Sequence, residues 1–146
     1  MIGAEWIGRE LGSSVLLVER GRLKFFAKAM GETNPIYFDE AAAKAAGYAD
    51  VPAPPTFLFA ADLDSGLIFN LLDQMGVALS KVLHGEQSFE YFAPVVAGDV
   101  ITFKSTIKNI YSKRAGALEF IELEGLAVNQ QGESVARTRN VTVVRN

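Results

Sequence analysis

Four segments in the second half of the chain alternate between apolar and polar residues over an unusual length. They read KVLHGEQSFEYFAPV, DVITFKSTIKNIYS, ALEFIELEGLAVNQ and SVARTRNVTVVR. In the second segment, Ile101, Phe103 and Ile107 fall on one face and Lys104 and Lys108 on the other, which is the two-residue repeat of a β-strand. The connectors VAGD, SKRAG and NQQGE carry the Gly, Asn and Asp that turns need. We therefore expect four strands of about 12 residues, longer than usual, that neighbour one another in an antiparallel meander.

The most apolar segment, from Thr56 to Leu72, precedes these strands and is expected to form one helix capped by Thr56. Its apolar residues point nearly all round, which predicts a helix buried on every side. Because helices come first and strands follow in series, the pattern indicates the α+β class. One apolar helix and one long sheet imply a curved antiparallel sheet wrapped around a central helix. The edges of such a sheet need a cover, and a second copy or a related subunit would provide one.

The first half of the chain predicts shorter elements. Residues 15–18 read as a short strand, and Glu19 to Met30 has the apolar spacing of a helix. Asn34-Pro35 marks a turn. A second helix is expected between Asp39, a good N-cap, and Gly47, a good terminator. The proline-rich stretch DVPAPPTF is expected to be extended and stiff.

Composition excludes several functional classes. With 146 residues, the chain suits a single domain spanning 1–146. It has no cysteine and only one histidine, His84, so disulfides, thiolate metal sites and multi-histidine metal sites within one chain are excluded. A net charge of −3 without a basic cluster argues against nucleic-acid binding. The N-terminus has no apolar run typical of a signal peptide, and the longest apolar stretch is interrupted by Asp62 and Asp64, so we expect no membrane span and a cytoplasmic location. No Gly-rich phosphate loop and no GxSxG elbow is present, and no cofactor is expected.

The first candidate for chemistry is the turn from Glu32 to Tyr37. A turn between helices presents side chains to solvent, so Glu32 and Tyr37 would hold a water molecule between them. The alternative is that Glu32 is simply exposed and the Tyr37 ring packs.

The second candidate is the start of the strand at LHGEQ. In a regular strand His84, Glu86 and Ser88 share one face, which makes His84 and Glu86 a possible acid–base pair. Gly85 suggests a bulge or a close approach of backbone or ligand. The alternative is a histidine at a strand end that is satisfied by backbone groups.

The third candidate is the expected start of the apolar helix at Pro55-Thr56-Phe57. Free N–H groups at a helix N-terminus stabilise developing negative charge on a carbonyl oxygen. Proline has no N–H, so donors begin at Thr56. Ordinary helix capping is the alternative.

Several stretches together resemble a known family. They are WIGRE, FAKAMGETNPIYFDEAAAKAAGY, VPAPPTF, VLHGEQSFEYFAPVVAGD and the closing strands. The chain resembles the MaoC-like (R)-specific enoyl-thioester hydratase and dehydratase family, which has a hot-dog fold. The likeness is greatest to its N-terminal dehydratase branch, which includes the acyl-binding subunits of mycobacterial-type (3R)-hydroxyacyl-ACP dehydratases.

The resemblance implies a site at the Glu32 turn. In active members the motif is Asp-x-Asn-Pro-x-His, and the Asp and His activate water, whereas here Glu32 replaces the Asp and Tyr37 the His. Tyrosine is a poor base, with an ordinary pKa of about 10 against about 6.5 for histidine. The resemblance implies catalytic roles for Glu32, Tyr37 and His84. It implies substrate-binding roles for these residues: Asn34, Pro55, Thr56, Phe57, Gly85, Glu86 and Gln87.

Three functions follow from the resemblance. In the first, the chain shapes an acyl-binding tunnel beside a separate MaoC-type subunit that carries the intact dyad. In the second, it is a self-sufficient homodimeric hydratase that uses Glu32, Tyr37 and His84. In the third, it is a non-enzymatic binder of acyl thioesters. The implied ligand is an acyl-CoA or acyl-ACP, and the implied assembly is a homodimer or a heterodimer.

Overall fold

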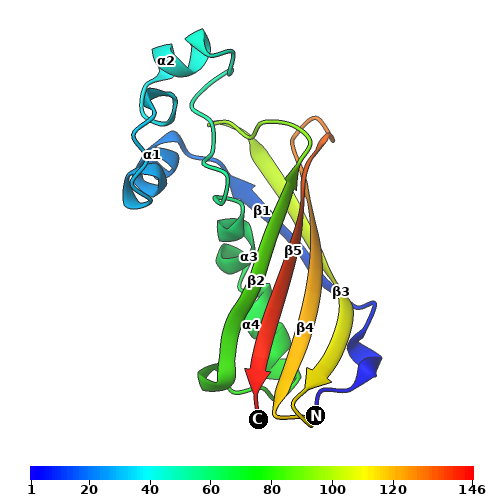
Figure 1. Ribbon diagram of the computed structural model, residues 1–146. Coiled ribbons are helices and arrows are strands. Elements are labelled where there is room, and N and C mark those ends of the chain that lie inside the picture. The colour runs from blue at the N-terminus through cyan, green and yellow to red at the C-terminus, as the bar shows by residue number, and fades with distance from the viewer.

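A five-stranded antiparallel sheet and four short α-helices make up the chain. The computed structural model describes residues 1–146 (Figure 1). The strands are β1 (Glu10–Leu17), β2 (Val82–Tyr91), β3 (Val100–Lys113), β4 (Leu118–Val128) and β5 (Ser134–Arg145). The helices are α1 (Arg20–Ala29), α2 (Glu40–Ala45), α3 (Phe59–Ser65) and α4 (Leu67–Gln74), with 3-10 turns at Ala4–Trp6, Pro35–Tyr37 and Leu79–Lys81. None of these helices is long and apolar enough to cross a membrane.

The strand order is β1-β3-β4-β5-β2, which corrects the expected meander in one place. Strands β3, β4 and β5 are consecutive neighbours as predicted, but β2 pairs with β5 rather than with β3. The reason is the connection 92–99, which pairs with the proline-rich stretch through the Ala53 N–H to the Val95 carbonyl and the Ala97 N–H to the Val51 carbonyl. This pairing carries the chain across the end of the sheet before β3 begins. Strand β1 occupies the other place beside β3 and is longer than predicted, because its polar first half also joins the ladder.

The expected single helix from Thr56 to Leu72 is wrong. Gly66 adopts a left-handed conformation with φ of 67°, which ends α3 and starts α4. Thr56 is not the cap, because α3 begins at Phe59 and is preceded by Leu58 without a side-chain capping bond. The expected burial on every side is also wrong: Leu63 and Phe69 are 44% and 42% exposed.

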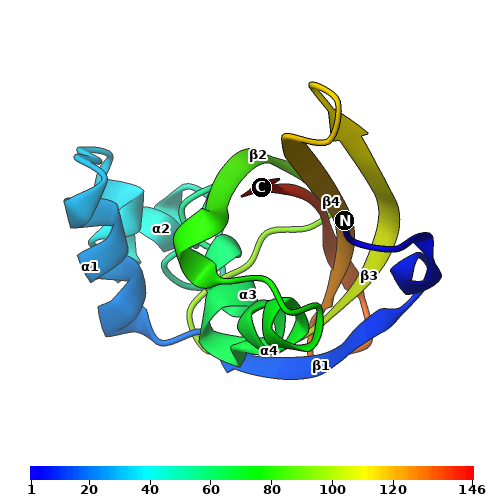
Figure 2. The same cartoon turned by 90° about the horizontal axis from the view of Figure 1, so that it is seen from below.

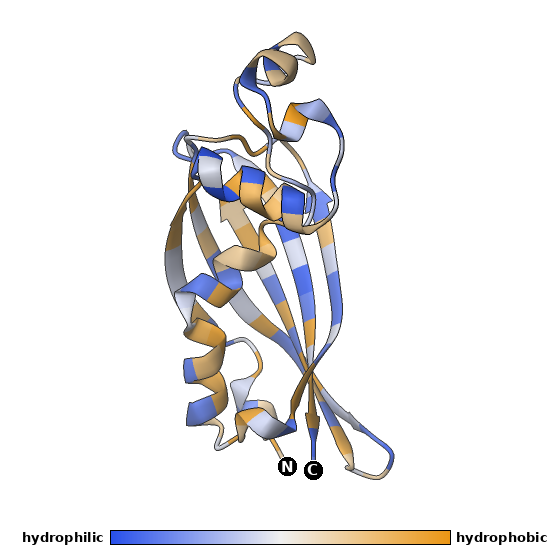
Figure 3. Ribbon diagram, turned by 90° about the vertical axis from the view of Figure 1, so that its left-hand side faces the viewer, coloured by the Kyte–Doolittle hydropathy of each residue, from blue (hydrophilic) through white to orange (hydrophobic).

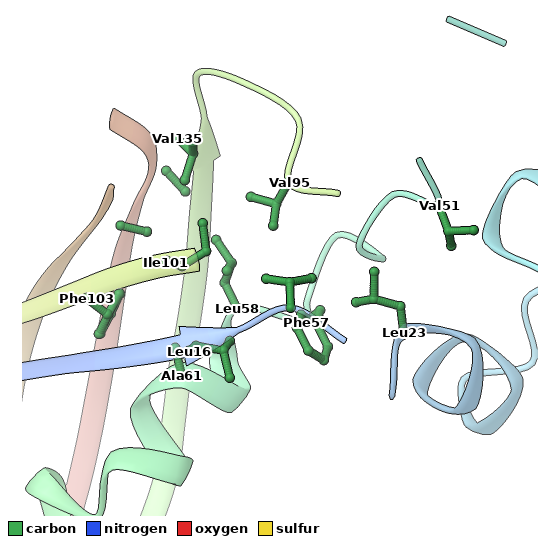
Figure 4. Close-up of a cluster of buried hydrophobic side chains, with 13 residues drawn as sticks. Leu16, Leu23, Val51, Phe57, Leu58, Ala61, Val95, Ile101, Phe103 and Val135 are labelled. Atoms are coloured by element: carbon green, nitrogen blue, oxygen red, sulfur yellow. The ribbon is translucent and has the colours of Figure 1, made fainter. Parts of the chain in front are cut away.

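The sheet curls around α3 and α4, as expected for a hot-dog fold. Seen from below, the two helices lie in the opening between the edge strands β1 and β2 (Figure 2). Below α3, the buried side chains of α4 pack with those of β3, β4 and β5: Leu71, Leu72, Ile107, Ile121, Leu123 and Val144. The upper core joins Phe57, Leu58 and Ala61 to the sheet and to Leu23 of α1 (Figure 4).

Helix α1 lies beside the upper end of the sheet and α2 lies beyond it, and together they form an arm beside the main body (Figure 1). Asp39 caps α2 by accepting from the Ala41 N–H, and Gly47 follows the helix with φ of 95°, as predicted. Arg22 anchors α1 to α3 through an ion pair with Asp64. The arm is therefore fixed to the body that carries the remaining predicted site residues.

Candidate functional site

Two pockets contain three of the ten predicted site residues: Tyr37 and Pro55 line the first, and His84 lines the second. The upper pocket, of about 360 Å³, lies where the arm meets the end of β2. Its lining residues are Tyr37, Tyr48, Pro52, Ala53, Pro55, Tyr91, Phe92, Ala93, Pro94 and Val95. The inner pocket, of about 150 Å³, lies between the α3–α4 pair and the concave face of the sheet. Its lining residues are Phe59, Asp62, Leu63, Ile68, Phe69, Leu72, Leu79, Val82, Leu83, His84, Leu123, Asn140 and Thr142.

Tyr37 enters the upper pocket from the 3-10 turn Pro35–Tyr37. Asn34 caps this turn, since its side-chain oxygen accepts from the Ile36 N–H at 3.2 Å. Partial burial, followed by the negative charge of Glu32, raises the pKa of Tyr37 above its ordinary value. Glu32 itself is half-buried and is not among the lining residues. The phenol is therefore protonated at neutral pH, which suits a hydrogen-bond donor and not a base.

Tyr91 is an upper-pocket residue that the sequence did not single out. Its hydroxyl donates to the Pro55 carbonyl oxygen, and burial raises the pKa of Tyr91 to about 12. The bond joins the end of β2 to the proline-rich stretch, 36 residues earlier in the chain. In the sequence, Tyr91 appears only as a strand residue on the same face as Phe89. Its hydrogen-bond partner, Pro55, is set by the path of the proline-rich stretch across the sheet.

The segment Pro55-Thr56-Phe57 is not the start of a helix, which corrects the third candidate. The Phe57 N–H donates to the Pro54 carbonyl at 2.9 Å, and the Phe57 ring is fully buried against Phe26. The Thr56 hydroxyl donates to Met30 Sδ at 3.4 Å. Of these three residues only Pro55 lines the upper pocket.

Gly85 forms the bulge that the sequence indicated, and the bulge separates His84 from Glu86. The pairing with β5 shifts between these residues, so His84 lies opposite Thr142 and Glu86 opposite Val141. His84 lines the inner pocket, whereas Glu86 forms an ion pair of 2.9 Å with Arg139. The predicted shared face and the acid–base pair of His84 with Glu86 are therefore wrong, because one extra residue reverses the sides of the strand.

The His84 ring is held by neutral groups. It stacks on Phe59 with centroids 4.9 Å apart, and Nε2 lies 3.1 Å from the Glu86 carbonyl oxygen and 3.2 Å from Asn140 Nδ2. Asn140 also donates to Gln87 Oε1 at 3.0 Å. His84 and Gln87 thus share a polar network on the concave face.

Asp62 is the second residue that sequence reasoning missed as a candidate. It lies on α3 and lines the inner pocket, where Ser105 of β3 donates to Oδ1 at 3.3 Å. Burial raises the pKa of Asp62 to about 6, and the Ser105 hydrogen bond opposes this rise only in part. In the sequence, Asp62 appears only as a charge that interrupts an apolar run.

Comparison with known proteins identifies the family. Residues 5–138 match the family model described as FAS1-like, dehydratase domain region. The chain belongs to this FAS1-like dehydratase family. A UPF0336 protein of Streptomyces avermitilis is 41% identical over 128 residues, which cover 88% of this chain and 84% of that protein.

Solved structures confirm the hot-dog fold of this FAS1-like dehydratase domain and its likeness to MaoC-like proteins. A chain of the HadBC (3R-hydroxyacyl-ACP dehydratase) complex from Mycobacterium tuberculosis has a TM-score of 0.81 at 23% identity, with 98% of this chain and 99% of that chain covered. A MaoC-like dehydratase has a TM-score of 0.85 at 25% identity, with 97% of this chain but only 42% of that chain covered. In that second protein, the dehydratase domain corresponds to less than half of the chain.

The dehydratase domain divides its predicted catalytic residues between two places. Tyr37 lines the upper pocket with Glu32 close enough to affect its pKa, whereas His84 lines the inner pocket. The upper pocket has no imidazole and no carboxylate among its lining residues. Within one chain the fold therefore brings together Glu32 with Tyr37, and His84 with Gln87, but does not unite the two pairs.

Proposed function

We propose that this dehydratase domain is a component of an (R)-specific enoyl-thioester hydratase or 3-hydroxyacyl-thioester dehydratase. It shapes the acyl-binding tunnel beside a separate MaoC-type subunit that carries the catalytic Asp and His. The substrate is an acyl-CoA or an acyl-ACP.

The environment of Tyr37 carries this proposal. Hydration of an enoyl thioester needs a base that takes a proton from water, and the ideal pKa of such a base lies near the working pH. Burial and the Glu32 charge move the pKa of Tyr37 further from that range. His84, the one imidazole of the chain, lies in the other pocket. A complete dyad therefore has to come from another chain.

The outer surface near β2 supports a partner. Strand β2 is an edge strand, so one side of its backbone has no neighbour in the sheet. Large apolar side chains on and beside it are partly exposed at the rim of the inner pocket: Leu63, Phe69, Leu79 and Leu83. Figure 3 shows hydrophobic positions in α3 and α4, the two helices that lie between β1 and β2. The similarity to a chain of a dehydratase complex agrees with a paired arrangement.

A homodimeric hydratase that uses Glu32, Tyr37 and His84 is the second candidate. The effect of the Glu32 charge on the pKa of the Tyr37 phenol favours it, because this carboxylate acts on the phenol within one chain. Two chains facing one another would be needed to bring in His84.

Hydration of crotonyl-CoA decides between these functions. The purified chain is assayed alone and together with a MaoC-type subunit that carries the Asp and His. We expect no turnover from the lone chain and full turnover from the pair, and the pair should lose turnover when the partner's catalytic Asp is replaced by Asn. Full activity of the lone, pure chain would overturn the proposal.

Single substitutions test the second candidate. Glu32→Gln and His84→Ala remove its base and its imidazole, and Glu10→Gln at the exposed start of β1 is the matched control. A loss in the first two variants, with the control unchanged, supports the homodimeric enzyme. Unchanged turnover in all three variants removes Glu32 and His84 from the mechanism. If acyl-CoA binds but stays unreacted both with and without the partner, the chain is a non-enzymatic binder.

A further inference from the structure

The inner pocket is mostly apolar and has a few polar groups in its lining. Helices α3 and α4 follow one another inside the curved sheet (Figure 1), and both line the pocket. The polar lining residues come from α3, from the start of β2 and from the second half of β5: Asp62, His84, Asn140 and Thr142. The apolar lining residues come from α3, from α4, from the segment before β2, from the first two residues of β2 and from β4: Phe59, Leu63, Ile68, Phe69, Leu72, Leu79, Val82, Leu83 and Leu123. An amphipathic chain, polar near one position and apolar beyond it, matches this lining.

Most polar groups of this lining are already satisfied by one another. Asn140 donates to Gln87 Oε1, lies within hydrogen-bond distance of His84 Nε2, and accepts from the Thr142 hydroxyl at 2.9 Å. The amide of Asn140 is therefore fully used within the chain.

Asp62 is the exception. Its Oδ1 accepts one bond from Ser105 at 3.3 Å, while Oδ2 has no hydrogen-bond partner in the chain. No cation pairs with it, whereas Asp64, two residues later, is paired with Arg22. A carboxylate removed from water without a cation is costly, and one free oxygen directed to a pocket is an acceptor available to a ligand.

We propose that the inner pocket binds an acyl chain that carries a hydroxyl group, with the hydroxyl donating to Asp62 and the alkyl end packing against α4 and the start of β2. The inference rests on the proposed function, because the acyl thioester supplies the chain. A volume of about 150 Å³ holds about five water-sized groups, which indicates a short chain. A plain alkyl chain of the same length would cover the carboxylate without offering it a donor. Asp62 therefore selects for the oxygenated chain and against the plain one.

Binding of three matched probes to the purified full-length chain tests this. The probes are hexanoyl-CoA, 3-hydroxyhexanoyl-CoA and 5-hydroxyhexanoyl-CoA, measured by titration calorimetry. The 5-hydroxyl probe has no hydroxyl next to the reacting carbons, so it reports binding even if the protein dehydrates the 3-hydroxyl probe. Of the two hydroxylated probes, we expect the one that binds more tightly to bind at least about tenfold more tightly than hexanoyl-CoA. The reason is that a hydrogen bond to a charged group is among the stronger ones.

Substitutions assign the preference to Asp62. Asp62→Leu should abolish it and strengthen hexanoyl-CoA binding, and Asp62→Asn, which keeps the size of the side chain, should reduce it. The exposed α4 carboxylate gives a matched control, Asp73→Asn, which should leave the preference unchanged.

The outcomes separate the inference from the proposed function. Equal binding of all three probes to the wild type, with no change in Asp62→Leu, overturns the role of Asp62 and leaves acyl binding intact. Failure of all three probes to bind, to the chain alone or with its MaoC-type partner, overturns both.

Discussion

The partly buried carboxyl of Asp62 makes the stability of the chain depend on pH in a direction opposite to that of most acidic residues. Burial raises the pKa of Asp62 from 3.8 to about 6. Below pH 3.8 the carboxyl is protonated in both the folded and the unfolded chain, so it has no differential effect. Between these values the folded state binds more protons than the unfolded state, so stability falls as pH rises, and above pH 6 the full cost of the buried charge is present.

The size of this effect follows from the shift in pKa. A shift of about two units corresponds to about 3 kcal/mol. Asp62→Asn removes the charge but keeps an oxygen that accepts from Ser105. We expect the variant to be as stable as the wild type near pH 4 and about 3 kcal/mol more stable at pH 8, which for a chain of this length is a rise in Tm of about 6 to 12 °C.

Urea unfolding of both proteins between pH 4 and pH 8 measures this difference directly. Subtracting the wild-type values from those of the variant cancels the titration of all other carboxylates, including Asp50, whose pKa the Arg20 guanidinium lowers to about 2. Asp73→Asn serves as the exposed control and should give a flat difference. A stability gain that is independent of pH, or a loss at pH 8, would refute the reasoning.

Three further substitutions test the fold by urea unfolding at neutral pH. Phe57→Ala empties a fully buried ring site and should cost about 3–5 kcal/mol; a cost below about 1 kcal/mol would contradict the tight upper core. Gly85→Ala places a Cβ 2.7 Å from Val143 Cγ2 and 3.0 Å from the Val141 carbonyl oxygen, so it should cost about 1–3 kcal/mol, and a neutral result would mean that β5 yields freely. Gly66→Ala meets no neighbouring atom but imposes a left-handed conformation on an L-residue, so it should cost about 1–2 kcal/mol. An increase in stability there would show that α3 and α4 prefer to join.

Local patterns predicted the elements of the fold better than their arrangement. Strict alternation located the four long strands, because the two-residue repeat is a property of each strand alone. The position of β2 depended instead on a contact between residues 51–53 and the connection 92–99, which no local pattern encodes. The break at Gly66 was missed because apolar residues continue on both sides of it, and a single glycine is tolerated within many helices.

The candidate site shows the same division. The turn at Asn34, the cap at Asp39 and the bulge at Gly85 each follow from one residue and its neighbours, and each was predicted. Asp62 and Tyr91 acquire their roles from partners 43 and 36 residues away in the chain, namely Ser105 and Pro55. These partners come together only in the folded chain, where the sheet wraps around the helices.

The bulge at Gly85 decides which residues of β2 face the concave side of the sheet. Before Gly85, even-numbered residues such as His84 face the concave side of the sheet. After Gly85, odd-numbered residues such as Gln87 face it. Deleting Gly85 would restore regular alternation along β2 and would therefore turn either His84 or Gln87 away from the concave face. The His84 ring and the Gln87 amide can both reach Asn140 only because the bulge adds one unpaired residue between them.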